Sequence, residues 1–380
     1  MTGGSPNPSA RTQEVYEMIR WKKMRREPLP NGTILSFLNG EEFVLQALLA
    51  ENKNALFYEV RSQTTGQAVV LKEFFNSHWV RLRGAPALKG WEQEPPDSRK
   101  LSRTYLWLRR QAEQEQRMNQ ELCGSVRCVI PEKPVLPAGT LVLPDGTEWQ
   151  WPYCAFLEMD GMTAAQGFPL QALMRECTNP NGPAHPFGNL RQQEECFVPR
   201  RNCAVPAAAV TMQIFRDTLL ALRPLHRAGW IMGDLSSGNL FVEGSLAEGR
   251  IQGVSFADVS TVRKIGGSEM PATAAPGFHA PELFSGPVTE KTDVFSAGRL
   301  LLSMLYPVAV HNVRLHRPLG FLDNTQTITA GESVPSGLPQ EMRAEVNRLL
   351  LRATAPDPEQ RISMDEMLAT AEDWCRRLER

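Results

Sequence analysis

The sequence predicts an α+β protein of two lobes, a small β-rich N-lobe followed by a larger α-helical C-lobe. Strand-like runs concentrate before residue 160, and helical runs dominate after residue 161. The chain has 380 residues, of which 42% are hydrophobic and 22% charged, an ordinary globular composition that allows a substantial core. Because a sheet and a helical layer each bury their own apolar face, we expect a cleft between the two lobes.

Composition excludes several classes of protein. The formal net charge of −1 gives no reason to expect nucleic acid or an anionic membrane as a partner. No run approaches the roughly 18 apolar residues that a membrane helix needs, and the first residues lack the apolar stretch of a secretory signal. Seven cysteines, an odd number spread over the chain, do not indicate a disulfide framework. These features predict a reduced, cytoplasmic protein and leave its oligomeric state open.

The N-lobe is expected over residues 34–160, after an N-terminal extension of residues 1–33 that is partly disordered. Short β-type runs lie at 43–45, 56–60 and 68–72, and Thr64-Thr65-Gly66-Gln67 predicts a hairpin between the last two. Residues 105–122 contain neither Gly nor Pro and read as a helix. Strands return between 136 and 158 around Asp145-Gly146, a second hairpin signal.

The C-lobe is expected over residues 161–380. It starts with a Cys/Pro/Asn-rich insertion at about 175–205, whose Cys and His residues lack the paired spacing typical of a zinc site. Helical runs follow at 207–227, 293–306, 338–354 and 363–378.

The most informative stretch begins where a helical run ends at Gly229. A loop then presents Asp234 and, five residues later, Asn239. This stretch resembles the catalytic loop H-R-D-L-x-x-x-N of the protein kinase superfamily. The resemblance implies that Asp234 orients the acceptor hydroxyl and that Asn239 holds a metal ion.

Four further motifs follow in the family's order. Asp258, in Asp258-Val259-Ser260, stands where the family has D-F-G, which implies a second metal ligand. Glu282 ends Ala280-Pro281-Glu282 like the family's A-P-E, and Arg361 lies in a D-P-x-x-R segment. The resemblance implies a buried Arg361–Glu282 pair, and it implies that Asp293 hydrogen-bonds the catalytic-loop backbone. Five motifs in order predict the kinase-like fold.

In the N-lobe, Lys72 matches the V-A-I-K lysine that binds the nucleotide's α- and β-phosphates. The family pairs this lysine with a helical Glu. Glu115 fits best because Met118 and Leu122 follow on the same apolar face, with Glu113 and Glu121 as competitors. The resemblance places the hinge at residues 156–161, with Leu157 beside adenine and the backbone of Glu158 and Met159 pairing with the base.

The chain departs from the family at several positions. Where a glycine-rich loop should cover the phosphates, it has Asn52, Lys53 and Asn54; asparagine tolerates left-handed geometry and lysine adds charge. The H-R of the catalytic loop is Met232-Gly233, so a phosphorylated activation loop lacks its Arg partner there. Ser236 and Ala275 replace a Lys and a Thr that support acceptor binding in protein Ser/Thr kinases.

These residues favour phosphoryl transfer from ATP, with Mg²⁺, to a Ser or Thr hydroxyl of a protein substrate. One alternative is a pseudokinase, a binding or scaffold module for a regulatory protein partner, because the phosphate loop is altered. The other is a small-molecule kinase, since Gly233-Asp234 is similar to the H-G-D loop of aminoglycoside-type phosphotransferases. The A-P-E, Asp293 and Arg361 motifs belong to the protein-kinase branch.

Overall fold

The computed structural model describes most of both lobes. Described are residues 28–51, 55–74, 98–123, 126, 129–130, 132, 136, 140–146, 148–150, 155–159, 162, 166–178, 197–199, 204–206, 208–245, 250–268, 278–305 and 338–379. The N-terminal extension up to residue 27, Asn52, Lys53, Asn54, Ala275 and residues 179–196 of the insertion lie outside the described residues.

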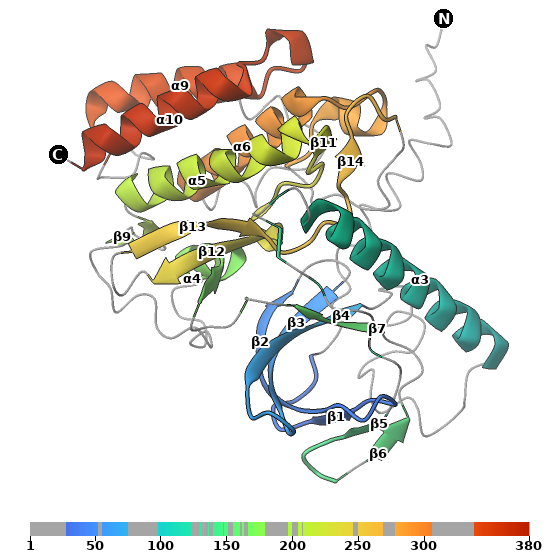
Figure 1. Cartoon of the computed structure of the whole chain (residues 1–380). Coiled ribbons are helices and arrows are strands. Elements are labelled where there is room, and N and C mark those ends of the chain that lie inside the picture. The colour runs from blue at the N-terminus through green and yellow to red at the C-terminus, as the bar shows by residue number, and fades with distance from the viewer. Residues whose placement is uncertain are drawn as a thin grey trace, which may run out of the picture.

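The N-lobe is built on one antiparallel sheet. Within the described residues its seven strands have the order β6-β5-β1-β2-β3-β4-β7. Their bounds are β1 Ile34–Ser36, β2 Glu42–Glu51, β3 Ala55–Ser62, β4 Ala68–Phe74, β5 Thr140–Val142, β6 Glu148–Gln150 and β7 Ala155–Met159. Figure 1 shows this sheet as a curved layer. Both predicted hairpins are confirmed, and Gly66 and Gly146 supply the positive φ angles, 70° and 84°, that their turns require.

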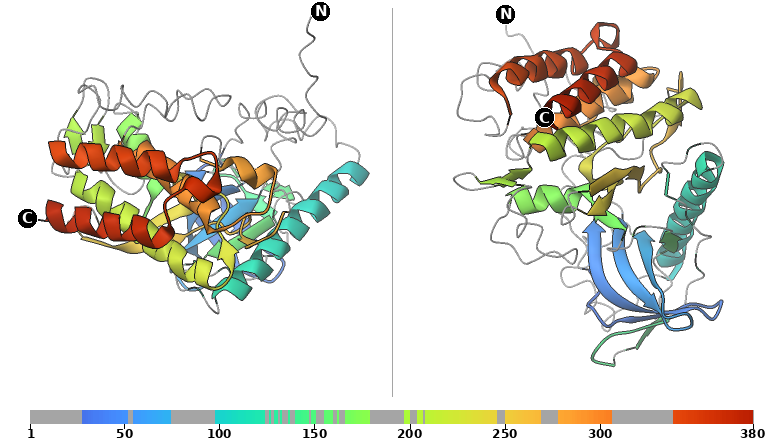
Figure 2. Two further views of the ribbon diagram at one scale, coloured as in Figure 1. Left: turned by 90° about the horizontal axis from the view of Figure 1, so that it is seen from above. Right: turned by 60° about the vertical axis from the view of Figure 1, so that its left-hand side comes forward.

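Helix α3, Ser98–Cys123, runs beside the sheet and contacts β7 (Figure 2). The predicted helix is confirmed, and it begins seven residues before the expected start at 105. The sequence Ser98-Arg99-Lys100 has no apolar periodicity, so pattern alone does not reveal this first turn. The helix carries Glu115 on the side that faces the sheet.

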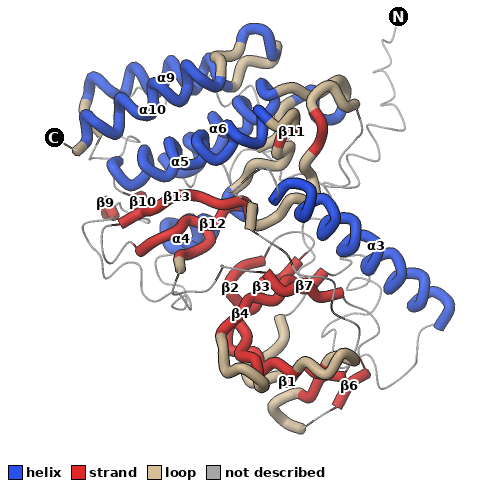
Figure 3. Tube along the Cα trace, viewed as in Figure 1, coloured by secondary structure: helices blue, strands red, loops and turns tan. Residues whose placement is uncertain are grey.

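The C-lobe is mainly helical (Figure 3). Its helices are α4 Leu170–Thr178, α5 Ala208–Arg227, α6 Glu290–Leu305, α9 Gln340–Ala353 and α10 Met364–Leu378. Small strands accompany them: β8 Gly167–Pro169, β9 Phe197–Pro199, β10 Ala204–Pro206, β11 Trp230–Ile231, β12 Leu240–Ser245, β13 Arg250–Phe256 and β14 Arg263–Lys264. The four predicted helices are confirmed to within a few residues. Helix α4, which begins before the region predicted as an insertion, and the β9–β10 hairpin at the end of that region were not predicted.

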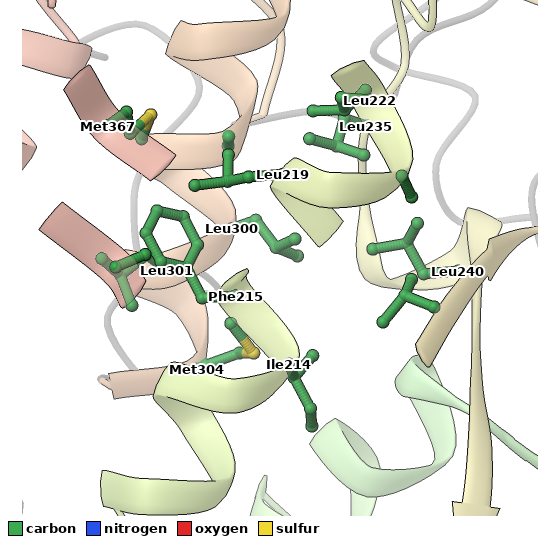
Figure 4. Close-up of a cluster of buried hydrophobic side chains, with 14 of the residues drawn as sticks. Ile214, Phe215, Leu219, Leu222, Leu235, Leu240, Leu300, Leu301, Met304 and Met367 are labelled. Carbon is green, nitrogen blue, oxygen red and sulfur yellow. The ribbon is translucent and has the colours of Figure 1, made fainter. Parts of the chain in front are cut away.

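The C-lobe core is a contact between three helices (Figure 4). Ile214, Phe215 and Leu219 repeat at helical spacing on α5, which gives that helix one apolar stripe. This stripe packs against Leu300 and Leu301 of α6 and against α10, and all these side chains are fully buried. No helix in the described part of the chain is long and apolar enough to cross a membrane.

Candidate active site

A β-hairpin brings two of the predicted site residues together. Strand β12 follows Asn239, and β13 ends two residues before Asp258. Leu240 pairs with Phe256, so the residues flanking this hairpin meet at its open end. The Ala257 N–H donates to the Asn239 carbonyl at 2.9 Å, which fixes the two loops to each other. Asn239 and Asp258 therefore lie at one edge of the cleft.

Asp234 is joined to this edge through Asn239. The Asn239 Nδ2 donates to the Asp234 carbonyl at 2.8 Å, and both side chains are buried. Asp293, in the first turn of α6, accepts from the Met232 N–H at 2.7 Å and from the Gly233 N–H at 2.9 Å. The expectation that Asp293 steadies the catalytic loop through its backbone is confirmed.

His226 also contacts Asp293, a contact that the sequence did not predict. Its Nε2 lies 2.8 Å from the Asp293 Oδ2. Both residues are buried, at 9% and 0% exposure. Helices α5 and α6 are thus linked through the carboxylate that holds the catalytic loop.

Lys72 lies across the cleft from this loop and meets three carboxyl groups. Its Nζ donates to the Glu115 Oε1, and it lies 3.5 Å from the Asp258 Oδ1 and 3.8 Å from the Glu132 Oε1. The expected contact between Lys72 and Glu115, rather than Glu113 or Glu121, is present. The ammonium also lies 4.8 Å from the ring centre of Phe74 and 5.6 Å from that of Phe57. Lys72 is 0% exposed, so this ammonium is buried.

The charges of this cluster are strongly coupled. Burial by itself lowers the pKa of Lys72, but Asp258, Glu115 and Glu132 outweigh it, and the net pKa is raised. Burial works to raise the pKa of Asp258, yet Lys72 and the Ser260 N–H, 3.0 Å from Oδ1, lower it overall. Lys72 is therefore charged and Asp258 ionised at neutral pH. Burial raises the pKa of Glu115 well above its usual range and that of Glu132 to about 7.

The donor set at the hairpin end fits Mg²⁺. Asp258 offers a carboxylate and Asn239 an amide oxygen, the hard ligands that this ion prefers. Once Glu132 is ionised, its carboxylate and that of Asp258 outnumber the single ammonium of Lys72, and a divalent cation offsets this excess of negative charge. Among the described residues, no group of three or more acidic, His or Cys side chains is arranged around one metal position. Phosphate and water oxygens are needed to complete the shell, as is usual for Mg²⁺.

The remaining predicted nucleotide residues lie in or beside β7. Leu157 pairs in register with Lys72, Glu158 with Leu71, and Met159 with Val70. The side chains of Leu157 and Glu158 are outside the described residues, whereas Met159 is buried at 2% exposure. Asn52, Lys53 and Asn54 connect β2 to β3 and are not described. Their predicted contacts with nucleotide stay predictions.

An apolar cluster from both lobes lies next to Lys72. It joins Phe57 and Val70 of the sheet to Phe241 of β12 and Ala257, together with Met159. Phe57 is 1% and Phe241 0% exposed. Since these side chains come from both lobes, a buried apolar cluster joins the lobes beside Lys72.

The expected buried pair between Arg361 and Glu282 is confirmed. The Arg361 Nη1 donates to the Glu282 Oε1 at 2.6 Å and the Nη2 to the Oε2 at 2.9 Å, a bidentate geometry. Burial raises the pKa of Glu282, but Arg361 more than reverses this, so the net pKa is lowered. The pair joins the segment before α6 to the turn before α10.

Gly233 takes a conformation that few other residues adopt. Its φ is 76°, and a Cβ built there lies 2.8 Å from the backbone oxygen of Thr261. We expect Gly233→Ala to lower the free energy of unfolding by about 2 kcal/mol, because left-handed backbone and a backbone clash both oppose the side chain. Gly229→Ala is the matched control: φ is 83°, with no atom within 4 Å of the added Cβ. Urea unfolding of both variants measures the difference, and equal losses would contradict the clash.

Glu132 is the site residue that sequence reasoning missed. No element was predicted between residues 122 and 136, where prolines at 131 and 134 interrupt the pattern. The sequence does contain one indication of this residue. Glu132 lies two positions after Ile130, so in an extended strand both side chains point to the same side. A carboxylate on the same side as a buried apolar residue is unusual, because charged side chains are rarely buried without a partner.

Comparisons with known proteins agree with this geometry. The family described as Protein kinase domain matches residues 190–374, just under half of the chain. The chain is 31% identical over 99 residues to a probable serine/threonine-protein kinase, zyg-1, of Caenorhabditis elegans, covering 26% of this chain and 14% of that protein. It is 27% identical over 153 residues to the serine/threonine-protein kinase PknG of Mycobacterium leprae, covering 40% and 17%. The matched segments thus span less than a fifth of either relative.

A solved structure shares the fold across the whole chain. The structure of vaccinia related kinase 3 superposes with a TM-score of 0.50 at 16% identity, covering 97% of this chain and 96% of that one. At this identity the likeness shows the bilobal α+β fold alone. The family match, the relatives, the fold and the order of the motifs agree: residues 190–374 match the protein kinase domain, and the chain shares its bilobal fold with a kinase structure.

Proposed function

We propose that this protein transfers the γ-phosphoryl group of ATP, with Mg²⁺, to a Ser or Thr hydroxyl of a protein. The observation that carries the proposal is the approach of Lys72 to both Glu115 and Asp258. This contact joins the sheet, helix α3 and the loop after β13. A protein substrate, and a cytoplasmic site of action, remain predictions from the sequence.

Each residue has a chemical task in this proposal. Lys72 neutralises α- and β-phosphate charge, and Glu115 holds its ammonium in place. Asn239 and Asp258 would hold Mg²⁺, which supplies positive charge to the phosphates when bound. Asp234 orients the acceptor hydroxyl. As the oxygen of that hydroxyl bonds to the γ-phosphorus, the bond from phosphorus to the β,γ-bridging oxygen breaks; ADP leaves, and Asp234 accepts the hydroxyl proton.

The proposal predicts transfer of label from ATP to protein. Purified protein incubated with γ-labelled ATP and Mg²⁺ is expected to label a generic protein acceptor or itself, on Ser or Thr identified by mass spectrometry. Lys72→Met is expected to lower this transfer by at least about 10²-fold, because the phosphates lose their ammonium partner. Unlabelled protein in the presence of bound nucleotide would contradict the enzymatic proposal.

A pseudokinase is the second candidate, and the apolar cluster favours it. Phe57 and Phe241 are buried in one apolar cluster, so a nucleotide base that entered there would have to displace packed side chains. Thermal unfolding with and without ATP and Mg²⁺ separates the candidates, since a ligand that binds the native state raises the melting temperature. The absence of any nucleotide-dependent shift would support the pseudokinase and contradict the enzyme.

The small-molecule kinase has less support. Its basis is Gly233-Asp234, and Gly233 is explained by its positive φ and by the close Thr261 backbone. The Arg361–Glu282 and Asp293 contacts belong to the motifs that speak for a protein kinase. Assaying aminoglycosides beside protein acceptors tests this candidate directly.

A further inference from the structure

Glu132 is held in place from two sides. The Asn119 Nδ2 donates to the Ile130 carbonyl at 2.7 Å, and the Glu132 N–H donates to the Asn119 Oδ1 at 3.0 Å. Asn119 lies one helical turn after Glu115 on α3, so the helix that carries the expected partner of Lys72 also fixes Glu132. On its other side Glu132 forms a β-bridge with Met159 at the end of β7. The two hydrogen bonds and the β-bridge therefore fix the position of the Glu132 backbone beside the site.

The Glu132 carboxyl faces the charged cluster. Its side chain is 0% exposed, and the Oε1 lies 3.8 Å from the Lys72 Nζ. Neither carboxyl oxygen has a hydrogen-bond partner of ordinary geometry among the described residues, although the Glu115 carboxyl is close enough to lower the pKa of Glu132. The titratable groups that interact with it are Lys72, Glu115, Asp258 and the Cys123 thiol at the end of α3. Lys72 is the one cation among them.

The proposed reaction needs one carboxylate to orient Lys72 and one to hold a cation. Glu115 and Asp258 meet these needs, so Glu132 adds a buried negative charge that the chemistry does not require. Two like charges a few ångströms apart in a buried site repel by more than they do in water. An anionic polyphosphate that approaches Lys72 meets the same repulsion.

We propose that Glu132 makes nucleotide binding depend on a divalent cation: its carboxylate shares Lys72 and leaves the cleft too negative for a metal-free polyphosphate. This inference rests on the proposed function, because it assumes that the phosphates approach Lys72. Glu132 is a positioning residue, acting on nucleotide through Lys72 and through its charge. A residue that merely supported the fold would affect both forms of nucleotide equally.

The test measures ADP binding by calorimetry, once with Mg²⁺ and once with EDTA, so that no activity is needed. Glu132→Gln keeps the shape and removes the charge. It is expected to tighten the binding of metal-free ADP by about tenfold and that of the magnesium complex by less. The ratio of the affinity with Mg²⁺ to the affinity with EDTA therefore falls. Measurement near pH 8 keeps Glu132 ionised, since burial raises the pKa of its carboxyl to about 7.

Glu73 provides the matched control. It is next to Lys72 on β4, is also buried, and accepts a hydrogen bond from the Tyr58 hydroxyl at 3.1 Å, so Glu73→Gln changes a neighbouring carboxyl outside the cluster. That variant is expected to keep the wild-type ratio of the two affinities. Glu132→Asp retains the charge and is expected to keep the ratio too. Glu132→Leu, also uncharged, replaces Glu132→Gln if the latter does not fold.

The outcomes are distinguishable. If the wild type binds ADP but the uncharged variants keep its ratio, or lose affinity for both forms equally, the inference is wrong and the proposed function stands. If neither form of ADP binds the wild type or any variant, the proposed function fails and takes the inference with it. A reduced ratio in the uncharged variants alone supports the role of Glu132.

Discussion

Asp234→Ala is expected to lower phosphoryl transfer by about 10²–10⁴-fold, because the acceptor hydroxyl loses the group that orients it and takes its proton. The fold is expected to persist, since Asn239 bonds the backbone carbonyl of Asp234 and Asp293 holds the two preceding N–H groups. Single-turnover rates with labelled ATP, together with the affinity for nucleotide, measure the effect. The loss should appear in kcat while nucleotide affinity stays close to the wild-type value.

The control is an aspartate far from the cleft. Asp365 on α10 has a side chain that is 78% exposed and pairs with Arg223 at 3.3 Å, so Asp365→Ala is expected to change neither rate nor stability by much. Unchanged transfer in Asp234→Ala would show that the catalytic group lies elsewhere. A variant that is inactive because it is unfolded would be recognised by its lost thermal transition.

Arg361→Met is expected to lower the free energy of unfolding by about 3–5 kcal/mol, because it leaves the Glu282 carboxylate without its partner. Arg361 is 3% exposed, and its guanidinium also donates to the carbonyls of Ala355, Lys291 and Pro356 at 2.8–3.0 Å. Methionine fills the space and supplies none of these donors. Urea denaturation of the purified variant gives the loss as a shift in midpoint.

A double substitution separates the pair from its surroundings. Arg361→Met combined with Glu282→Met removes both charges, and we expect it to be more stable than Arg361→Met alone, since no carboxylate is left half-buried and unpaired. If the loss of stability in the double variant equalled the sum of the losses in Arg361→Met and Glu282→Met, the carbonyl contacts of Arg361 rather than the pair would carry the stability. Arg361→Lys is expected to restore little of the lost stability, because an ammonium cannot form the bidentate hydrogen bonds of a guanidinium.

Much of the C-lobe follows from local pattern. The helices are long and have apolar stripes of clear period, such as Ile214, Phe215 and Leu219, so their positions are predicted to within a few residues. The hairpin turns carry Gly where φ is positive. The first turn of α3 was not predicted, because Ser98-Arg99-Lys100 carries no apolar residue. Helix α4 was not predicted although Leu170, Leu173 and Met174 have helical spacing, because it is only nine residues long.

In the candidate site, too, some contacts were predicted from the sequence and others were not. The order of Asp234, Asn239, Asp258, Glu282, Asp293 and Arg361 along the chain predicts the kinase-like fold, and the contacts of Asp293 and of the Arg361–Glu282 pair are present. Glu115 was favoured over its neighbours by helical spacing, and it is the one that meets Lys72. The roles of these residues in transfer stay predictions until the variants above are measured.

The amino-acid sequence by itself determined the fold class, the order of the motifs and which helical face holds Glu115, since these depend on spacing along one chain. Only the tertiary structure decided which remote residues are buried together: Glu132 beside Lys72, His226 against Asp293, and Phe57 in one apolar cluster with Phe241. The physical reason is that burial energies, whether electrostatic or apolar, depend on distances between segments that are remote in sequence, and local pattern does not encode those distances.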